Sequence, residues 1–181
     1  DLLSCEDYWN TTTSSSNVGF EPFPGTLNVT YSREKFWIGN TIVIDIGETL
    51  IFEGCELAIS PGFEIIVNDG GTLIISDDPA TPPIVTEFSR AHIFSCDEMW
   101  QGITINVGGT LEINGQQSGS DSFCKIENAI TAVNALGNGA STGEPTISLT
   151  SVTFSNNLIP IYLDDDDFGT TLIRSCNFEC I

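Results

Sequence analysis

One phrase recurs along this chain and decides its fold: Gly70-Gly71-Thr72-Leu73-Ile74-Ile75, which returns as Gly108-Gly109-Thr110-Leu111-Glu112-Ile113. Each copy is a turn residue followed by Thr and by aliphatic residues, a pattern typical of a short strand after a tight turn. Looser copies contain the pairs Thr49-Leu50, Thr146-Ile147 and Thr171-Leu172. Such internal repetition indicates a solenoid.

The intervals between the copies give the length of one repeat. The threonines lie 23, 38, 36 and 25 residues apart, which suits a unit of about two dozen residues with loops inserted in the middle of the chain. A second phrase repeats at similar intervals, as Ile126-Glu127-Asn128, Phe154-Ser155-Asn156 and Phe178-Glu179-Cys180. We therefore predict a parallel β-solenoid, in which each unit buries its apolar face on neighbours about 4.8 Å away.

Composition supports an all-β fold and excludes several partners. The 181 residues include 22 Ile and 19 Thr but only 7 Ala, a bias toward side chains that favour strands over helices. A net charge of −20 argues against nucleic acid and anionic membranes as partners. No apolar stretch is long enough to span a bilayer, and the chain begins with Asp1, so we expect a processed, soluble, exported protein.

The beginning of the chain differs from the rest. A polar tract at residues 11–16 precedes Phe20-Glu21-Pro22-Phe23-Pro24-Gly25, which predicts turns with aromatic anchors. We expect residues 1–36 to form a non-repetitive entry or cap segment. The repeats would then occupy residues 37–181, and we expect the last of them to be incomplete at the C-terminus.

Two further stretches carry a family resemblance. Ser95-Cys96-Asp97-Glu98-Met99-Trp100-Gln101-Gly102-Ile103 and Cys124-Lys125-Ile126-Glu127-Asn128-Ala129-Ile130 resemble the secreted right-handed parallel β-helix proteins of Bacteroidota, over about residues 37 to 181. The resemblance implies a right-handed parallel β-helix, extracellular or cell-surface localisation, and an adhesin-like protein exported by a type IX system.

The six cysteines do not fall into the paired spacings of a zinc site, so disulfides in an oxidising compartment fit better. The second phrase places Cys124 and Cys176 in one column with Val152 between them, too far apart to pair with each other. Cys96 with Cys124 and Cys5 with Cys55 are the candidate disulfides, and buried free thiols are the alternative.

Other candidate residues have mainly structural interpretations. Asn128 and Asn156 fall one repeat apart at a turn, where stacked amides can form a hydrogen-bonded ladder. Trp100 is expected to pack at a corner, with sugar stacking as the alternative. The run Asp164-Asp165-Asp166-Asp167 is either a solvated loop or a weak calcium site, because it lacks the spacing of an EF-hand. We expect no cofactor other than calcium at this run.

An enzymatic function finds little support. A polysaccharide lyase of the β-helix type needs clustered cations, whereas the five Lys and Arg residues are spread over the repeats. A glycoside hydrolase needs facing carboxylates, one with a raised pKa, and no such column is evident. His92, the only histidine, has no obvious partner. A carbohydrate-active enzyme is therefore the alternative function.

We predict a non-enzymatic extracellular structural or adhesive module of a bacterial surface protein or filament. Its loops at residues 76–92, 114–123 and 136–145 would be presented to a glycan or protein partner. A solenoid exposes unpaired strands at its ends. We therefore also expect either self-association through the solenoid ends or continuation in a longer chain, without membrane insertion.

Overall fold

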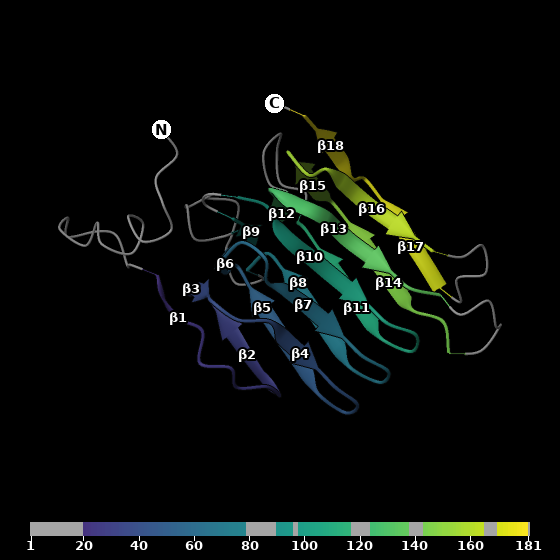
Figure 1. The fold of residues 1–181 in the computed structure, drawn as a ribbon, viewed down its shortest axis with the longest axis horizontal. Coiled ribbons are helices and arrows are strands. Elements are labelled where there is room, and N and C mark those ends of the chain that lie inside the picture. Colours follow the sequence, from purple (N-terminus) through teal and green to yellow (C-terminus); the bar gives the residue numbers. More distant parts are fainter. Residues whose placement is uncertain are drawn as a thin grey trace.

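The computed structural model describes residues 20–78, 90–95, 98–116, 124–137, 143–164 and 170–180 of the chain. Their regular structure is entirely β-strand, in three parallel sheets (Figure 1). Nothing in these residues resembles a membrane-crossing helix.

We name the sheets A, B and C. Sheet A has the order β1 (Glu21–Pro22), β3 (Lys35–Ile38), β6 (Glu56–Ile59), β9 (His92–Phe94), β12 (Cys124–Glu127), β15 (Val152–Ser155) and β18 (Asn177–Glu179). Sheet B has the order β2 (Val29–Ser32), β5 (Thr49–Glu53), β8 (Thr72–Ser76), β11 (Thr110–Asn114), β14 (Thr146–Thr150) and β17 (Thr170–Arg174). Sheet C has the order β4 (Ile42–Ile44), β7 (Glu64–Val67), β10 (Trp100–Ile105), β13 (Ala129–Ala135) and β16 (Ile159–Leu163).

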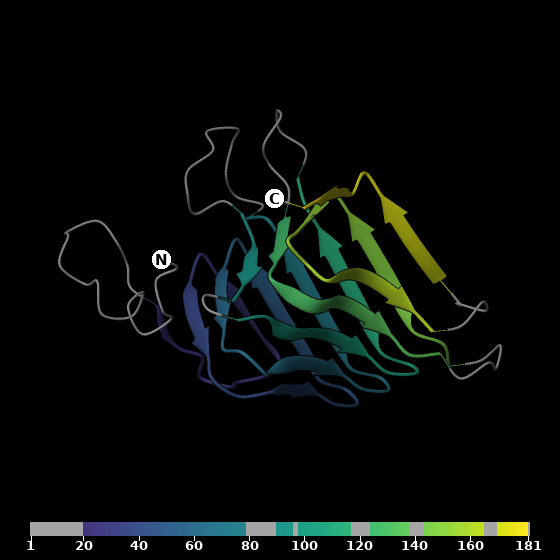
Figure 2. The ribbon, with the colours of Figure 1, turned by 45° about the horizontal axis from the view of Figure 1, so that its top comes forward.

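The chain visits the sheets in a fixed cycle. From β3 onward it passes from sheet A to C to B and back to A, and each return adds one strand to the same side of every sheet. We call each passage through sheets C, B and A a coil, from a first coil of β2 and β3 to a last coil of β16, β17 and β18, and we name the connections the A–C, C–B and B–A corners. Figure 2 shows the coils stacked side by side. This arrangement is consistent with a parallel β-helix.

The strand register confirms most of the predicted repeat. Thr49, Thr72, Thr110 and Thr146 are successive partners in sheet B, and Ile126, Phe154 and Phe178 are successive partners in sheet A. The last copy of the first phrase was wrong by one residue, because Thr146 pairs with Thr170 rather than with Thr171.

The physical reason for this difference is the inward-facing column of sheet B. The register places Ile173 opposite the buried Leu149, whereas the expected alignment would have turned Leu172 inward. Because side chains alternate between the two faces of a strand, a shift by one residue exchanges the inward and outward sets. Thr171 therefore takes the inward position that Ile147 occupies one coil earlier.

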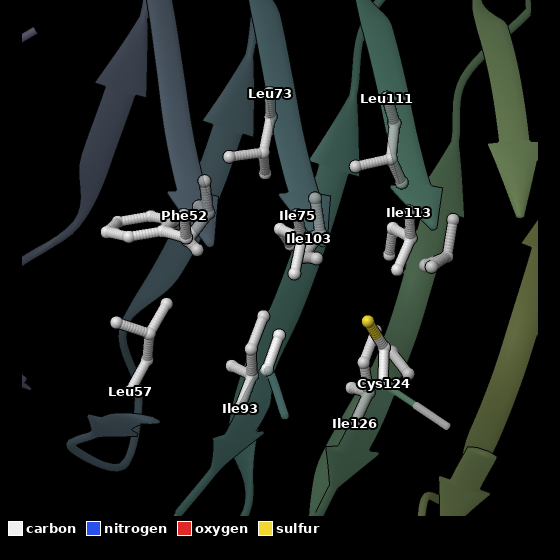
Figure 3. Packing of buried hydrophobic residues seen from close by; sticks show 14 of the residues in the cluster. Phe52, Leu57, Leu73, Ile75, Ile93, Ile103, Leu111, Ile113, Cys124 and Ile126 are labelled. Atoms are coloured by element: carbon white, nitrogen blue, oxygen red, sulfur yellow. The ribbon is translucent and has the colours of Figure 1, made fainter. Parts of the chain in front are cut away.

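The core is a stack of aliphatic columns between the three sheets. Figure 3 shows Leu73 beside Leu111, and Ile93 beside Ile126, each pair from successive coils. These side chains are almost completely buried. Burial of one aliphatic side chain contributes roughly 1.5–3 kcal/mol, so the stacked columns are the main stabilising element of the fold.

The first strands begin earlier than expected. Val29–Ser32 pairs with β5 and Lys35–Ile38 pairs with β6, so the boundary expected after residue 36 falls inside β3. Of the expected cap segment, residues 1–19 lie outside the described residues. Phe23 packs against the first coils through Tyr31 and Phe36, with ring centroids 5.4 and 5.5 Å away.

A row of amides fixes the C–B corner. Asn106 Nδ2 donates to Asn68 Oδ1, and Asn68 Nδ2 donates to Asp45 Oδ1, each at 2.6 Å. Each of these residues opens a turn whose third residue is a glycine with positive φ: Gly47, Gly70 and Gly108. The residues that open these turns therefore also supply hydrogen bonds between coils.

Candidate functional site

Two inserted segments leave and rejoin the stack at the B–A corner in successive coils. In the coil of β14 and β15, Ser151 alone spans this corner. The backbone bonds Gly115 N to Thr150 O and Asp77 N to Asn114 O place Asp77 and Gly115 at the corresponding position. Residues 78–90 and 116–123 are therefore insertions. Most of both insertions lies outside the described residues, but their roots at the corner are described.

Asp77 connects the roots of both insertions. Its Oδ1 accepts from Ala91 N at 3.1 Å, where the first insertion rejoins the stack. Its Oδ2 accepts from Gln116 N at 2.7 Å, where the second insertion begins. Cys124 Sγ, at the end of the second insertion, donates to Asp77 Oδ1 at 3.4 Å. One buried carboxylate thus holds three root residues from two coils.

Burial governs the electrostatics of this carboxylate. Desolvation raises the pKa of Asp77, while the backbone N–H groups of Gln116 and Ala91 act in the opposite direction. Beside it, Asp78 is also buried and pairs with Arg33 from the first coil. The sequence around Asp77 and Asp78 predicts a simple turn. Their hydrogen bonds and ion pair with residues distant in the chain cannot be predicted from that sequence.

All five Lys and Arg residues lie along this corner, between the first coil and the last. Arg33, Lys35, Arg90, Lys125 and Arg174 are the only Lys and Arg residues of the chain. Each lies in the B–A corner or on the adjoining end of a strand in sheet A or B. As expected, these residues are spread over the repeats, from the first coil to the last, but they share one phase of the coil and therefore lie along one corner.

Three ionisable side chains, His92, Lys125 and Glu127, meet on the outer face of sheet A. His92 Nε2 lies 3.0 Å from Glu127 Oε2, and Lys125 Nζ lies 2.9 Å from the same oxygen. The hydrogen bond from His92, followed by that from Lys125, lowers the pKa of Glu127 to about 2 against the effect of its burial. The His92 ring also stacks on Phe94, with centroids 4.6 Å apart.

The structure describes four of the six cysteines. Cys55 and Cys124 are buried, and none of the described cysteines forms a disulfide. Their candidate partners, Cys5 and Cys96, lie outside the described residues, so both pairings remain predictions. Burial raises the pKa of Cys55 to about 11 and that of Cys124 well above its usual value. Val152 lies between Cys124 and Cys176, as the repeat predicts.

Two predicted corner residues lie at the A–C corner, one coil apart. Asn128 and Asn156 follow the paired residues Glu127 and Ser155, and both have positive φ. Asn128 Nδ2 donates to the backbone O of Ser95 at 3.1 Å. Asn157, which the sequence did not single out, bridges to the previous coil by accepting from Ala129 N and donating to Ile126 O.

Trp100 packs at the A–C corner, as expected. Its side chain is completely buried, and its indole N–H donates to Glu127 O at 3.0 Å. A sugar ring therefore has no access to the indole face. The sugar-stacking alternative for Trp100 was wrong because the neighbouring coil covers the position.

The acidic run begins at the C–B corner. Asp164 follows β16 and accepts from the hydroxyl of Tyr162 at 3.0 Å, while Asp165, Asp166 and Asp167 lie outside the described residues. Within the described ranges, no three His, Cys, Asp or Glu side chains are grouped to hold a metal ion. Calcium at residues 164–167 therefore stays a prediction.

No family model matches the chain, and no curated protein or solved structure matches it significantly. The resemblance to secreted β-helix proteins of Bacteroidota thus stays a prediction from the quoted sequence stretches.

Proposed function

We propose that the chain is a right-handed parallel β-helix that acts as a non-enzymatic structural or adhesive module of an extracellular bacterial surface protein or filament. Its function is presentation: the stacked coils form a rigid support, and inserted loops at the B–A corner contact a glycan or protein partner. The observation that carries this proposal is the position of Asp77, which joins the roots of two insertions from successive coils.

The support is suited to presentation because the insertions leave the strand register intact. β8, β11 and β14 pair without a shift in sheet B although both insertions follow directly after strands of this sheet. Loops placed on a rigid scaffold can vary in sequence without loss of the fold, which is how binding surfaces are commonly built. All five Lys and Arg residues of a chain whose net charge is −20 lie along this corner.

Electrostatics favour presentation over the alternative of a carbohydrate-active enzyme. A glycoside hydrolase needs a general acid whose pKa is raised and whose proton faces the substrate. Glu127 has a lowered pKa. Asp77 has a raised pKa, but its oxygens face backbone N–H groups and the Cys124 thiol.

Binding of glycans and cells by a variant with a shortened B–A loop tests this function. In the first variant, residues 116–123 are deleted so that Gly115 joins Cys124, as Ser151 joins Val152 in the next coil. The matched control carries Ile46→Asp, a change of an exposed residue at the C–B corner outside the three predicted loops. Both variants and the parent are applied to a glycan array and to bacterial cells, and their circular dichroism spectra check that the fold is kept.

We expect the parent and the C–B control to bind and the B–A variant to lose binding. Equal binding by all three proteins, or no binding by any of them, would contradict presentation at the B–A corner. Turnover of polyuronate or of a neutral glycan that is abolished by Glu127→Gln would favour the enzyme alternative instead.

A further inference from the structure

The last coil differs from all the others in its exposure. It consists of β16, β17 and β18, each paired to the previous coil on one side only among the described strands. Phe178 is 53% exposed, whereas its partner Phe154 in the previous coil is 2% exposed. Ile173 is 42% exposed, whereas its partner Leu149 is fully buried. The inward columns of the core therefore end in open apolar side chains.

The last coil nevertheless has the conformation of a complete coil. Ser175 repeats the positive φ of Ser151 at the B–A corner, with values of 55° and 54°. Phe178 stacks on Phe154 with centroids 5.4 Å apart and rings inclined by only 9°. All three of its strands are parallel and in register with the preceding coil. The coil thus continues the strand register of β13, β14 and β15 and presents unpaired strand edges in the same arrangement.

At the opposite end of the stack the inward apolar side chains are covered, although β2 and β4 are each paired on one side only among the described strands. Phe23 packs against the first two coils, with its ring centroid 5.8 Å from that of Phe52 and 5.5 Å from that of Phe36. β1 covers the edge of β3, and Pro22 within β1 has no N–H to offer a further strand. Tyr31 at this end is almost buried. The two ends of the stack are therefore not equivalent.

From these observations we propose that the surface formed by β16, β17 and β18 binds one further parallel β-coil with aliphatic or aromatic inward residues, so that the stack extends from this end. Three strand edges must be paired at once, and the apolar columns must be covered in the same step. A coil of the same kind does both, because it continues the interface already formed between β13–β15 and β16–β18.

A second copy of this chain fits the surface less well. Its other end carries Phe23 over the buried Phe36 and Phe52, so it offers no exposed apolar columns. Its open end would meet β16–β18 by a two-fold rotation, so the strands would run antiparallel and interrupt the parallel register. Two chains of net charge −20 also repel each other.

The experiment extends the chain by one coil. A copy of residues 157–180 is appended after Cys180, because the register repeats from Asn156 to Cys180. The matched control carries the same extension with the copies of Ile161 and Ile173 replaced by Asp. Amide hydrogen exchange is measured in β16, β17 and β18 of the parent, the extended chain and the control.

We expect exchange in the three strands to slow at least about tenfold in the extended chain and to remain at the parent's rate in the control. Equal exchange rates in all three proteins would overturn the proposal. A parent that sediments as a dimer, and becomes monomeric with Ile173→Asp but not with Ile46→Asp, would also overturn it by identifying a second copy as the occupant. Ile46 is a suitable control because it is 77% exposed and lies far from the last coil in the stack.

This inference rests on the structural part of the proposed function. The two can fail separately, because the extension experiment does not involve the B–A insertions and the binding experiment does not involve the last coil.

Discussion

His92 Nε2 lies 3.0 Å from Glu127 Oε2, although the two residues are 35 positions apart in the chain. They belong to successive strands of sheet A, and Lys125 contacts the same carboxylate oxygen. One carboxylate therefore connects the β9 and β12 strands through two charged or chargeable partners. Its pKa, lowered to about 2, makes this contact sensitive to acid.

We predict that Glu127→Gln removes a contribution to stability that depends on pH. Folding lowers the pKa of Glu127 from 4.5 to about 2. The contribution of Glu127 to the free energy of unfolding is therefore fully present above pH 4.5 and is lost as the pH falls toward 2. After allowance for solvent around the pair, this contribution is about 1–2 kcal/mol. The measurement is the free energy of unfolding of both proteins across this range. A constant difference between them down to pH 2 would contradict the prediction.

Asp77→Ala should destabilise the B–A corner strongly. The change leaves Ala91 N and Gln116 N without their acceptor, and an unsatisfied buried N–H costs about 1–3 kcal/mol. We expect a loss of roughly 2–4 kcal/mol in the free energy of unfolding and faster exchange of these two amides. The control is Asp69→Ala at the C–B corner, for which we expect a smaller loss. Unchanged exchange at Ala91 would show that Asp77 does not hold the insertion.

Gly102→Ala should also be destabilising. A Cβ at this position would lie 1.7 Å from Thr131 O, where the register of β10 and β13 shifts, and φ is +113°. We expect a loss of about 2–3 kcal/mol in the free energy of unfolding. Gly62→Ala is the control, because Gly62 has φ of +82° but no atom within 4 Å of the added Cβ. Its cost should be only the backbone strain of about 1–2 kcal/mol.

The thiols should differ in their reaction with an alkylating reagent. The thiolate is the reactive form, and burial raises the pKa of Cys55 and of Cys124. Cys180 is exposed. We expect Cys180 to be alkylated rapidly in the native protein and the two buried thiols only after unfolding, as measured by mass mapping of the labelled residues. Rapid native labelling of Cys124 would contradict its placement in the core.

The sequence was most informative where one residue type recurs at one phase of the coil. Thr72 and Thr110 each follow a glycine turn, so their alignment depends on a local signal that the fold preserves. The last repeat was misaligned because Thr170 and Thr171 both fit the phrase. Only packing of Ile173 against the column of Leu149 decides between them, and packing is not visible in a short phrase.

The candidate site was less predictable for a geometric reason. The two insertions change the spacing between residues that share a corner, so Arg33 and Arg90 look unrelated in sequence although they reach the same corner. The partnership of His92 with Glu127 has the same origin. It would have been found by aligning Ile93 with Ile126, which the structure shows to be partners. The bonds of Asp77 depend on insertion roots and have no sequence signal of their own.

The amide row at the C–B corner also determines a direction. A carboxylate can only accept hydrogen bonds at neutral pH, so Asp45 forces Asn68 to present its NH₂ group, and Asn68 in turn presents its oxygen to Asn106. In a row made only of asparagines, every amide could exchange its NH₂ group and its oxygen at once, and the two arrangements would have nearly equal energies. One ionised residue at the first position removes that degeneracy, and the orientation of each later amide is inherited from it.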